Sequence, residues 1–274
     1  KVTRTHVANF MASRYKISDI SLKEINHMFL TDFENFLRVE AKCNANTTAK
    51  FMQFFKRIVI IAKNNGWIKA DPFANYKIRL KKVDRGYLTQ EEVEAIMAKQ
   101  FSTKRLEQVR DIFIFSCFCG LAYIDVKKLR KENIRTSFDG NLWIITRRKK
   151  TNTESNIRLL DVPRKIIEKY KGMAKDNKVF PMPSNTTCNK KLKAIADLCG
   201  IKTHLTYHVA RHSAATTILL SNGVPIETVS RLLGHTNIKT TQIYAKITAQ
   251  KISQDMETLS HKLEDMEKNI CRAI

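Results

Sequence analysis

The sequence predicts a mainly α-helical protein of two domains, with one small antiparallel β-sheet in the second domain. Its 274 residues are enough for two domains. Helical spacing of apolar residues dominates the first third, whereas two short apolar runs around a polar turn, within residues 142–160, predict a β-hairpin. We expect a helical domain over residues 1–83, a second domain over residues 84–248 and a C-terminal helix over residues 249–274.

Two amphipathic segments, residues 23–40 and 48–63, define the first domain. The apolar stripe of the first segment consists of Ile25, Met28, Phe29, Phe33, Phe36 and Leu37. The second segment ends at Asn64-Asn65-Gly66, a polar run typical of a helix end. Asp71-Pro72 then breaks the chain, and the basic stretch at residues 77–86 predicts an exposed linker.

The second domain is predicted to begin with a capped helix. Thr89 and Glu92 have the spacing of a capping box, in which each side chain accepts a hydrogen bond from an amide at the helix start. A buried helix is expected over residues 109–118. Leu142–Thr146 and Asn156–Leu160 predict the two strands of the hairpin.

A last amphipathic helix is predicted at the C-terminus. Its apolar residues recur at alternating steps of four and three: Ile252, Met256, Leu259, Leu263, Met266 and Ile270. Such a stripe needs a cover. By default the stripe packs on its own domain, but we expect the helix to dock on a neighbouring protomer.

The composition indicates a polyanionic partner. Lys and Arg number 49 against 26 Asp and Glu, a formal net charge of +23 that is spread along the chain. Such a surface binds nucleic acid through counterion release, so that affinity falls steeply with salt. RNA and acidic membrane surfaces are alternatives. We expect no membrane partner, because no apolar run approaches the roughly 18 residues of a spanning helix and no signal peptide opens the chain.

The cysteines indicate reduced thiols. The six residues, at positions 43, 117, 119, 188, 199 and 271, lack paired metal-ligand spacing, and several lie in apolar segments. A glycine-rich phosphate loop is also missing from the sequence. We therefore expect a cytoplasmic protein without disulfides, zinc or other cofactors.

A group of polar side chains within 37 residues predicts chemistry on a phosphodiester: His208, Arg211, His212, His235 and Tyr244. The first three share one side of a helix, because residues three and four apart are neighbours there. His235 follows a helix-ending glycine, and Tyr244 comes nine residues later on a predicted short helix. A phenol has a pKa of about 10, so as a nucleophile it needs a base and nearby cations, which His208, Arg211 and His235 can supply.

The group resembles the C-terminal signature of the tyrosine recombinases, also called the phage integrase family. That signature is His-x-x-Arg-His, then Leu-Gly-His, then tyrosine, and it is matched by His208, Arg211, His212, Leu233, Gly234, His235 and Tyr244. Residues 120–129 look like the variants carried by Bacteroides-type mobile elements. The resemblance implies a SAM-like core-binding domain over residues 1–83 and the catalytic domain over residues 84–248, closing as a clamp around duplex DNA.

The resemblance also implies roles for individual residues. Tyr244 becomes joined to a DNA 3′-phosphate, while Arg211 and His235 stabilise the transition state. His208 assists removal of the tyrosine proton or orients the phosphate. The family has a hairpin lysine that protonates the departing 5′-oxygen, and Lys150 matches it best, with Lys149 as the alternative.

Further basic residues are expected to bind the DNA. They are Arg147, Arg148, Lys149, His212, Lys81 and Lys82. Loops with several basic residues usually contact phosphates.

One position departs from the family pattern. Most members carry an arginine directly after a Gly-Leu pair, but here Ala122 follows Gly120-Leu121. Another cation must replace it, and the candidates are Arg110, Lys127 and Arg130. We favour Arg110, because it lies on the apolar stripe of the helix over residues 109–118, where a guanidinium needs an anion or acceptors. The alternative is a structural pair of Arg110 with an acid, such as Asp111, Asp125 or Glu132.

The sequence thus predicts a site-specific DNA recombinase that cleaves and rejoins strands through a 3′-phosphotyrosine. Its expected partners are double-stranded DNA, further copies of the chain in a tetramer on DNA, and accessory DNA-bending proteins. A type IB topoisomerase uses nearly the same chemistry but rejoins the original strand. A non-catalytic DNA-binding protein is the alternative that Ala122 leaves open.

Overall fold

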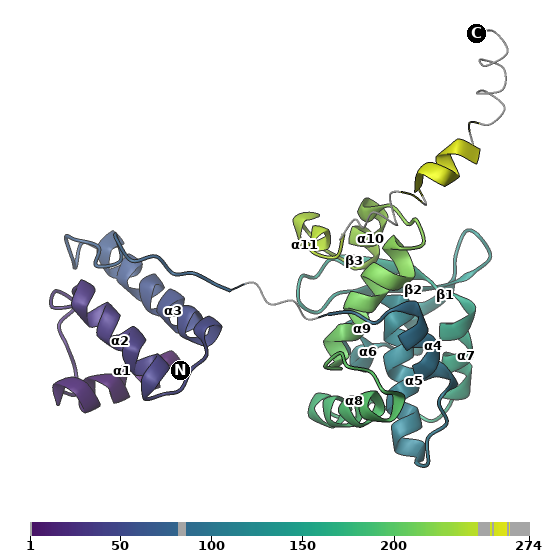
Figure 1. Cartoon of the computed structure of the whole chain (residues 1–274), viewed down its shortest axis with the longest axis horizontal. Coiled ribbons are helices and arrows are strands. Elements are labelled where there is room, and N and C mark those ends of the chain that lie inside the picture. The colour runs from purple at the N-terminus through teal and green to yellow at the C-terminus, as the bar shows by residue number, and fades with distance from the viewer. Residues whose placement is uncertain (1, 82–85, 246–252, 254, 262, 264–274) are drawn as a thin grey trace, which may run out of the picture. The chain divides into compact units, whose positions relative to one another are not determined.

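The computed structural model describes residues 2–81, 86–245, 253, 255–261 and 263. The chain divides into two compact units, Lys1–Asp84 and Arg85–Ile274, each with its own hydrophobic core. Helices make up most of the structure, and a small antiparallel sheet lies in the second unit (Figure 1).

The first unit is built from helices around an aromatic core. Its helices are α1 (Val2–Phe10), the π-helical turn η1 (Met11–Tyr15), α2 (His27–Val39) and α3 (Ala45–Asn64). Asn26 and Asn44 cap α2 and α3 by accepting hydrogen bonds from the amides of Phe29 and Thr47. Rings from these helices and from the turn after α3 meet in the core: Phe10, Phe29, Phe33, Phe36, Phe55 and Phe73.

The predicted stripe on α2 is confirmed except for one residue. Ile25, Phe29, Phe33, Phe36 and Leu37 are buried, whereas Met28 is 70 % exposed. Adjacent helical residues point about 100° apart, so a buried stripe that includes Phe29 and Phe33 leaves Met28 outside it. Leu30, which was not part of the predicted stripe, is buried in the core.

The second unit carries the remaining elements. Its helices are α4 (Gln90–Ala98), α5 (Lys104–Cys119), α6 (Tyr123–Lys128), the 3₁₀ turn η2 (Lys131–Asn133), α7 (Asp161–Lys169), α8 (Asn185–Cys199), α9 (Tyr207–Ser213), the π-helical η3 (Ala214–Leu220), α10 (Ile226–Leu232) and α11 (Lys239–Gln242). The predicted capping box at Thr89 and Glu92 is confirmed at the start of α4.

Helix α5 forms the centre of this unit. It packs against α4, α7, α8 and α9, which explains why most of its residues from Val109 to Cys119 are buried. Thr103 caps its start, and Gly120 ends it in the left-handed conformation, at φ 65°. The chain therefore leaves the buried helix at a sharply defined point, which becomes part of the site.

The sheet has three antiparallel strands in the order β1-β2-β3: β1 (Ile134–Thr136), β2 (Leu142–Arg147) and β3 (Glu154–Arg158). The predicted hairpin is β2 and β3, in a register that pairs Ile144 with Ile157 and Arg147 with Glu154. Strand β1, which has three residues, was not predicted from the sequence. Helix α10 packs against β3, so the hairpin lies beside the segment that carries His235.

The C-terminal prediction falls partly outside the described residues. Residues 255–261 are helical, with Met256 58 % and Leu259 43 % exposed. Ile252, Met266 and Ile270 lie outside the described residues. Among the helices of the described ranges, none combines the length and the apolar character needed to span a bilayer.

Candidate functional site

Helix α9 brings Arg211 into the interior of the second unit. The Tyr207 hydroxyl lies 2.5 Å from the Ser116 hydroxyl of α5, and the Tyr207 amide donates to the Asn189 side chain of α8. With Tyr207, Val209 and Ala210 buried, the helix is fixed in rotation. Arg211, one turn after Tyr207, therefore points inward and is only 3 % exposed.

Main-chain carbonyls hold the Arg211 guanidinium. Its Nη1 donates to the Gly120 carbonyl at 2.7 Å and its Nη2 to the Leu233 carbonyl at 2.5 Å. The site thus joins the ends of α5 and α10. A Cβ at residue 120 would approach Leu233 Cδ2 to 2.5 Å, and with its positive φ this position requires glycine.

His235 lies beside the same guanidinium. It follows Gly234, whose φ of 60° turns the chain out of α10. Its Nε2 is 2.9 Å from Arg211 Nη2, and its Nδ1 is 2.8 Å from the Thr241 hydroxyl oxygen. Burial, followed by the charges of Arg211 and Arg148, lowers the pKa of His235 to about 4, so the imidazole is neutral at pH 7.

Tyr244 lies in the same group, only 6 % exposed. It comes two residues after α11 and not within it, and it packs in a small apolar cluster with Val229 and Leu233. Its ring is stacked on His235 at a centroid distance of 6.3 Å. Burial lowers the pKa of Arg211 to about 10 with a further contribution from Arg148, and the Tyr244 oxygen acts in the opposite direction. The phenol and the guanidinium therefore interact within one chain.

His212 is the imidazole of α9 that contacts Tyr244. The two rings meet edge to face, with centroids 4.9 Å apart at an interplanar angle of 84°. His208 is exposed, and its ring contacts His212 at 4.8 Å. His208 and His212 share a side of α9, as their spacing predicts, and His212 lies in ring contact with both His208 and Tyr244, whereas Arg211 points inward. This contact with the phenol was missed in the sequence, where His212 was assigned to DNA binding alone.

Arg148 is the main residue of the site whose buried position was not predicted from the sequence. Its side chain is 11 % exposed, it donates to the Gly234 carbonyl at 3.3 Å, and it is close enough to lower the pKa of both Arg211 and His235. Strand alternation was the available signal: Ile144 faces inward on β2, and Arg148 follows four residues later, directly after the strand ends, where the same alternation predicts an inward side chain.

The carboxylate of Asp125 lies beside Arg148. Asp125 of α6 is buried, with its Oδ2 4.0 Å from Arg148 Nε, and its Oδ1 accepts a hydrogen bond from the Lys149 amide at 2.9 Å. Within the described residues, Arg148 Nε has no hydrogen-bond partner although it is buried. A second guanidinium therefore lies beside Arg211 with part of its donor capacity unused.

The tip of the hairpin is bound to the site but exposes its lysines. The Thr151 hydroxyl donates to the Gly234 carbonyl at 3.3 Å, while Lys149 and Lys150 are exposed. A pocket of about 310 Å³ borders the tip, and its basic lining residues are Lys128, Arg147, Arg148 and Lys149. Arg147 is exposed and paired with Glu154 across the hairpin at 2.9 Å.

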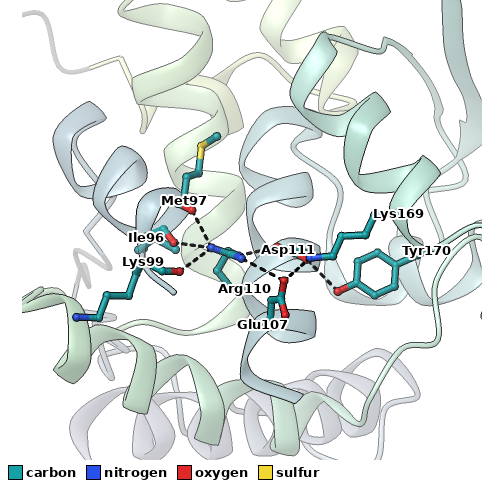
Figure 2. Close-up of polar contacts among 8 residues, drawn as sticks. All are labelled: Ile96, Met97, Lys99, Glu107, Arg110, Asp111, Lys169 and Tyr170. Carbon is teal, nitrogen blue, oxygen red and sulfur yellow. Dashed lines mark hydrogen bonds and ion pairs between the residues drawn. The ribbon is translucent and has the colours of Figure 1, made fainter. Parts of the chain in front are cut away.

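The structure corrects the assignment of Arg110. Figure 2 shows its guanidinium bound to the end of α4, where Nη1 donates to the carbonyls of Ile96, Met97 and Lys99 at 3.2, 2.8 and 3.0 Å. Its Nε donates to Asp111 at 2.5 Å. The structural alternative therefore holds, and Arg110 is not the displaced catalytic arginine. It lies ten residues before Gly120 on α5, which corresponds to about 15 Å of helix.

Asp111 ties Arg110 into a wider network. Its second oxygen accepts hydrogen bonds from Lys169 Nζ at 2.7 Å and from the Tyr170 hydroxyl at 2.9 Å, and Lys169 also pairs with Glu107 (Figure 2). These contacts join α4, α5 and α7. The other two candidates, Lys127 and Arg130, are exposed, as expected for charges at a helix end.

Lys81 and Lys82 are the two linker lysines that the sequence predicts to bind DNA. Lys81 is exposed, and its backbone amide and carbonyl are both bound by the Asn46 side chain at the start of α3. Lys82 falls outside the described residues. The described cysteines are free thiols, of which Cys117, Cys119 and Cys188 are buried.

Comparisons with known proteins agree with this geometry. The model of the phage integrase family matches residues 86–251, and the model of the phage integrase SAM-like domain matches residues 1–78. Tyrosine recombinase XerD of Lacticaseibacillus casei is 30 % identical over 225 residues, which cover 74 % of this chain and 70 % of that protein.

Two solved structures are similar in fold. The Tn1549 transposon integrase in complex with a circular intermediate DNA has a TM-score of 0.71 at 13 % identity, covering 94 % of this chain and 92 % of that one. A lambda integrase dimer bound to a COC′ core site has a TM-score of 0.69 at 18 % identity, covering 88 % and 87 %. The chain thus belongs to the phage integrase family and is a tyrosine site-specific recombinase with a SAM-like core-binding domain.

Proposed function

We propose that this recombinase cleaves and rejoins double-stranded DNA for a mobile element of the Bacteroides type, with Tyr244 as the nucleophile. One observation carries the proposal: a buried phenol lies in ring contact with His212 and His235 and interacts with the Arg211 guanidinium of its own chain. Attack by its oxygen on the scissile phosphorus leaves a 3′-phosphotyrosine and a free 5′-hydroxyl. A 5′-hydroxyl from another duplex then displaces the tyrosine.

Arg211, His235 and Arg148 stabilise the transition state in this proposal. Ala122, where most of the family has arginine, is the N-cap of α6 and lies two residues after the carbonyl that binds Arg211. Its methyl group cannot stabilise an oxyanion. Arg148 supplies the missing guanidinium from the end of β2. Its buried Nε–H has no hydrogen-bond acceptor among the described residues, which supports this role, because such a donor favours an anion.

The remaining polar side chains act on protons and on the substrate phosphate. His208 is exposed, and we assign it to orienting the phosphate, while His212 is the imidazole in contact with the Tyr244 ring. Lys150 protonates the departing 5′-oxygen from the exposed hairpin tip. An alkoxide is a poor leaving group, and a positioned acid typically contributes about 10²–10⁴-fold to such a step.

The DNA and the assembly follow from charge and from the similar proteins. Lys149, Arg147, Lys81 and Lys82 bind the backbone of the duplex, so affinity falls steeply with salt. The lambda integrase structure is a dimer on its core site, and we propose a tetramer of this chain on two sites, assembled through the C-terminal segment. The Tn1549 protein, a transposon integrase, supports the mobile-element assignment.

The nucleophile is tested with a nicked suicide DNA substrate. We expect a covalent protein–DNA adduct, its loss in Tyr244→Phe and its retention in Tyr87→Phe, a tyrosine outside the group. An adduct with Tyr244→Phe would reject the assignment, and no adduct with any variant would favour a non-catalytic DNA-binding protein. Relaxation of supercoils without recombinant product would identify a topoisomerase.

The general acid is tested with a substrate whose leaving oxygen is replaced by sulfur. A thiolate leaves without protonation, so the sulfur substrate restores the cleavage rate of a variant that lacks the acid. We expect rescue of Lys150→Ala and no rescue of Lys149→Ala, whose defect lies in DNA affinity. The reverse pattern would make Lys149 the acid.

A further inference from the structure

Thr241 connects the two functional side chains that follow α10. Its hydroxyl oxygen lies 2.8 Å from His235 Nδ1, and its backbone carbonyl accepts the hydrogen bond of the Tyr244 amide at 2.9 Å. It is fully buried. A single residue thus contacts the imidazole through its side chain and the nucleophile through its backbone.

The contacts of His235 define where its proton lies. A guanidinium only donates hydrogen bonds, so Nε2, 2.9 Å from Arg211 Nη2, must be an acceptor. The neutral ring then carries its proton on Nδ1 and donates it to the Thr241 oxygen. In the protein without DNA, His235 therefore presents a lone pair to the site, which cannot donate to a phosphate oxygen.

We propose that Thr241 is a positioning residue that holds His235 by its Nδ1–H, so that Nε2 faces the reacting phosphate and takes up a proton when DNA binds. The inference rests on the role proposed above for His235. In this step the phosphate oxygens take over the Arg211 donor, Nε2 binds one proton from solvent, and the imidazolium donates from Nε2 to the phosphate and from Nδ1 to Thr241. The phosphate charge offsets the guanidinium charges that oppose protonation in the free protein.

The same residue sets the geometry between the imidazole and the phenol. Because the Tyr244 amide is bound to the Thr241 carbonyl, a shift of Thr241 moves both groups relative to the phosphate. Misplacement of a reacting group by about 1 Å can cost about 100-fold in rate. The hydroxyl is thus needed for the protonation of His235, and the backbone for the position of Tyr244.

The test compares three substitutions. Thr241→Val removes the hydroxyl at nearly the same volume, Thr241→Ser keeps it, and Thr240→Val makes the same change at the exposed neighbouring position. In single-turnover cleavage of a suicide substrate, we expect Thr241→Val to lower the rate constant about 10–100-fold at unchanged DNA affinity. Thr241→Ser stays within about threefold of the wild type, and Thr240→Val does not change the rate.

Nitrogen-15 NMR of the histidines gives a readout that a purely structural role would not change. We expect the proton of His235 on Nδ1 in the free protein. Both ring nitrogens become protonated when a DNA site binds the uncleaving Tyr244→Phe protein. With Thr241→Val added, the imidazole stays neutral on DNA.

Several results would overturn the inference. They are a proton on Nε2 in the free protein, wild-type cleavage by Thr241→Val, or equal losses in Thr241→Val and Thr241→Ser. Failure of the underlying role is recognised separately: if His235→Ala cleaves at the wild-type rate, His235 does not contact the reacting phosphate. Thermal unfolding of each variant shows whether a loss of rate comes from a loss of fold.

Discussion

Two guanidinium clusters in the second unit are almost equally buried and differ in what surrounds them. The Arg110 side chain is 12 % exposed and the Arg148 side chain 11 %. Arg110 meets three helix-end carbonyls and the carboxylate of Asp111, which brings its own network of partners. Its charge and its donors are therefore satisfied by the protein.

The surroundings of Arg148 are different, because they add positive charge and few acceptors. Its neighbours are a second guanidinium, Arg211, a neutral His235 and one carboxylate, Asp125, at 4.0 Å. Its Nε–H is buried without an acceptor in the described structure. Since burial is the same in the two clusters, an excess of positive charge and unused donors mark the place for a substrate anion.

Removal of Arg148 should have the largest effect. Arg148→Ala takes away a preorganised donor from the proposed oxyanion site, and we expect the cleavage rate constant to fall about 10²–10³-fold. Single-turnover formation of the covalent adduct measures it. A rate within threefold of the wild type would show that Arg148, like Arg110, is not needed for cleavage.

Removal of Arg110 should change stability and leave chemistry intact. Arg110→Met deprives Asp111 and the end of α4 of donors, and we expect a loss of about 1–3 kcal/mol in the free energy of unfolding. Urea unfolding gives this value. In conditions where the variant is folded, its adduct should form at the wild-type rate, and a loss comparable to that of Arg148→Ala would contradict the structural assignment.

A smaller change can displace Arg148 without removing it. A Cβ at Gly234 would lie 2.7 Å from Arg148 Cδ, whereas Gly223, with a similar positive φ, has no atom within 4 Å. Both Gly→Ala substitutions carry backbone strain of about 1–2 kcal/mol. We expect only Gly234→Ala to slow cleavage, by about tenfold, in the adduct assay. Equal rates for both variants would show that the position of Arg148 is unimportant.

The smallest effect concerns the pH dependence of folding. The pKa of His235 is about 4 in the folded protein, below its ordinary 6.5. Between these values the unfolded chain binds a proton that the folded chain does not, so stability rises with pH through this window and levels off above it. Urea unfolding across the window should give a shallower rise for His235→Gln than for the wild type. Identical slopes would mean that His235 is already protonated beside the two guanidiniums.

Most of the fold could be predicted because its signals are local. The stripes of α2 and α3, the capping box at Thr89 and the hairpin follow from spacing and turn residues within short segments. The exceptions are also physical. Met28 lies just outside the buried stripe of α2. Strand β1 is only three residues long, so it is recognised by its pairing with β2 and not by a pattern in its own sequence.

Residue types and order alone determined the main site group. His208, Arg211, His212, His235 and Tyr244 are close in sequence, and the structure brings them together. For the cation that belongs with them the sequence favoured Arg110, whose guanidinium is bound by Asp111 and by carbonyls at the end of α4. A polar residue on an apolar stripe has to meet either a ligand or protein acceptors, and the stripe of α5 does not tell which of the two Arg110 meets.

Only the tertiary structure showed that Arg110 is bound by protein groups and that Arg148 lies in the site. The carbonyls at the end of α4 come close to Arg110, and the hairpin carries Arg148 to the carbonyl of Gly234, 86 residues away in sequence. Sequence by itself determines helical faces, caps and the order of reactive residues, because these depend on neighbours a few positions apart. Which buried donors have an acceptor depends on the packing of distant segments, and that is set by the fold as a whole.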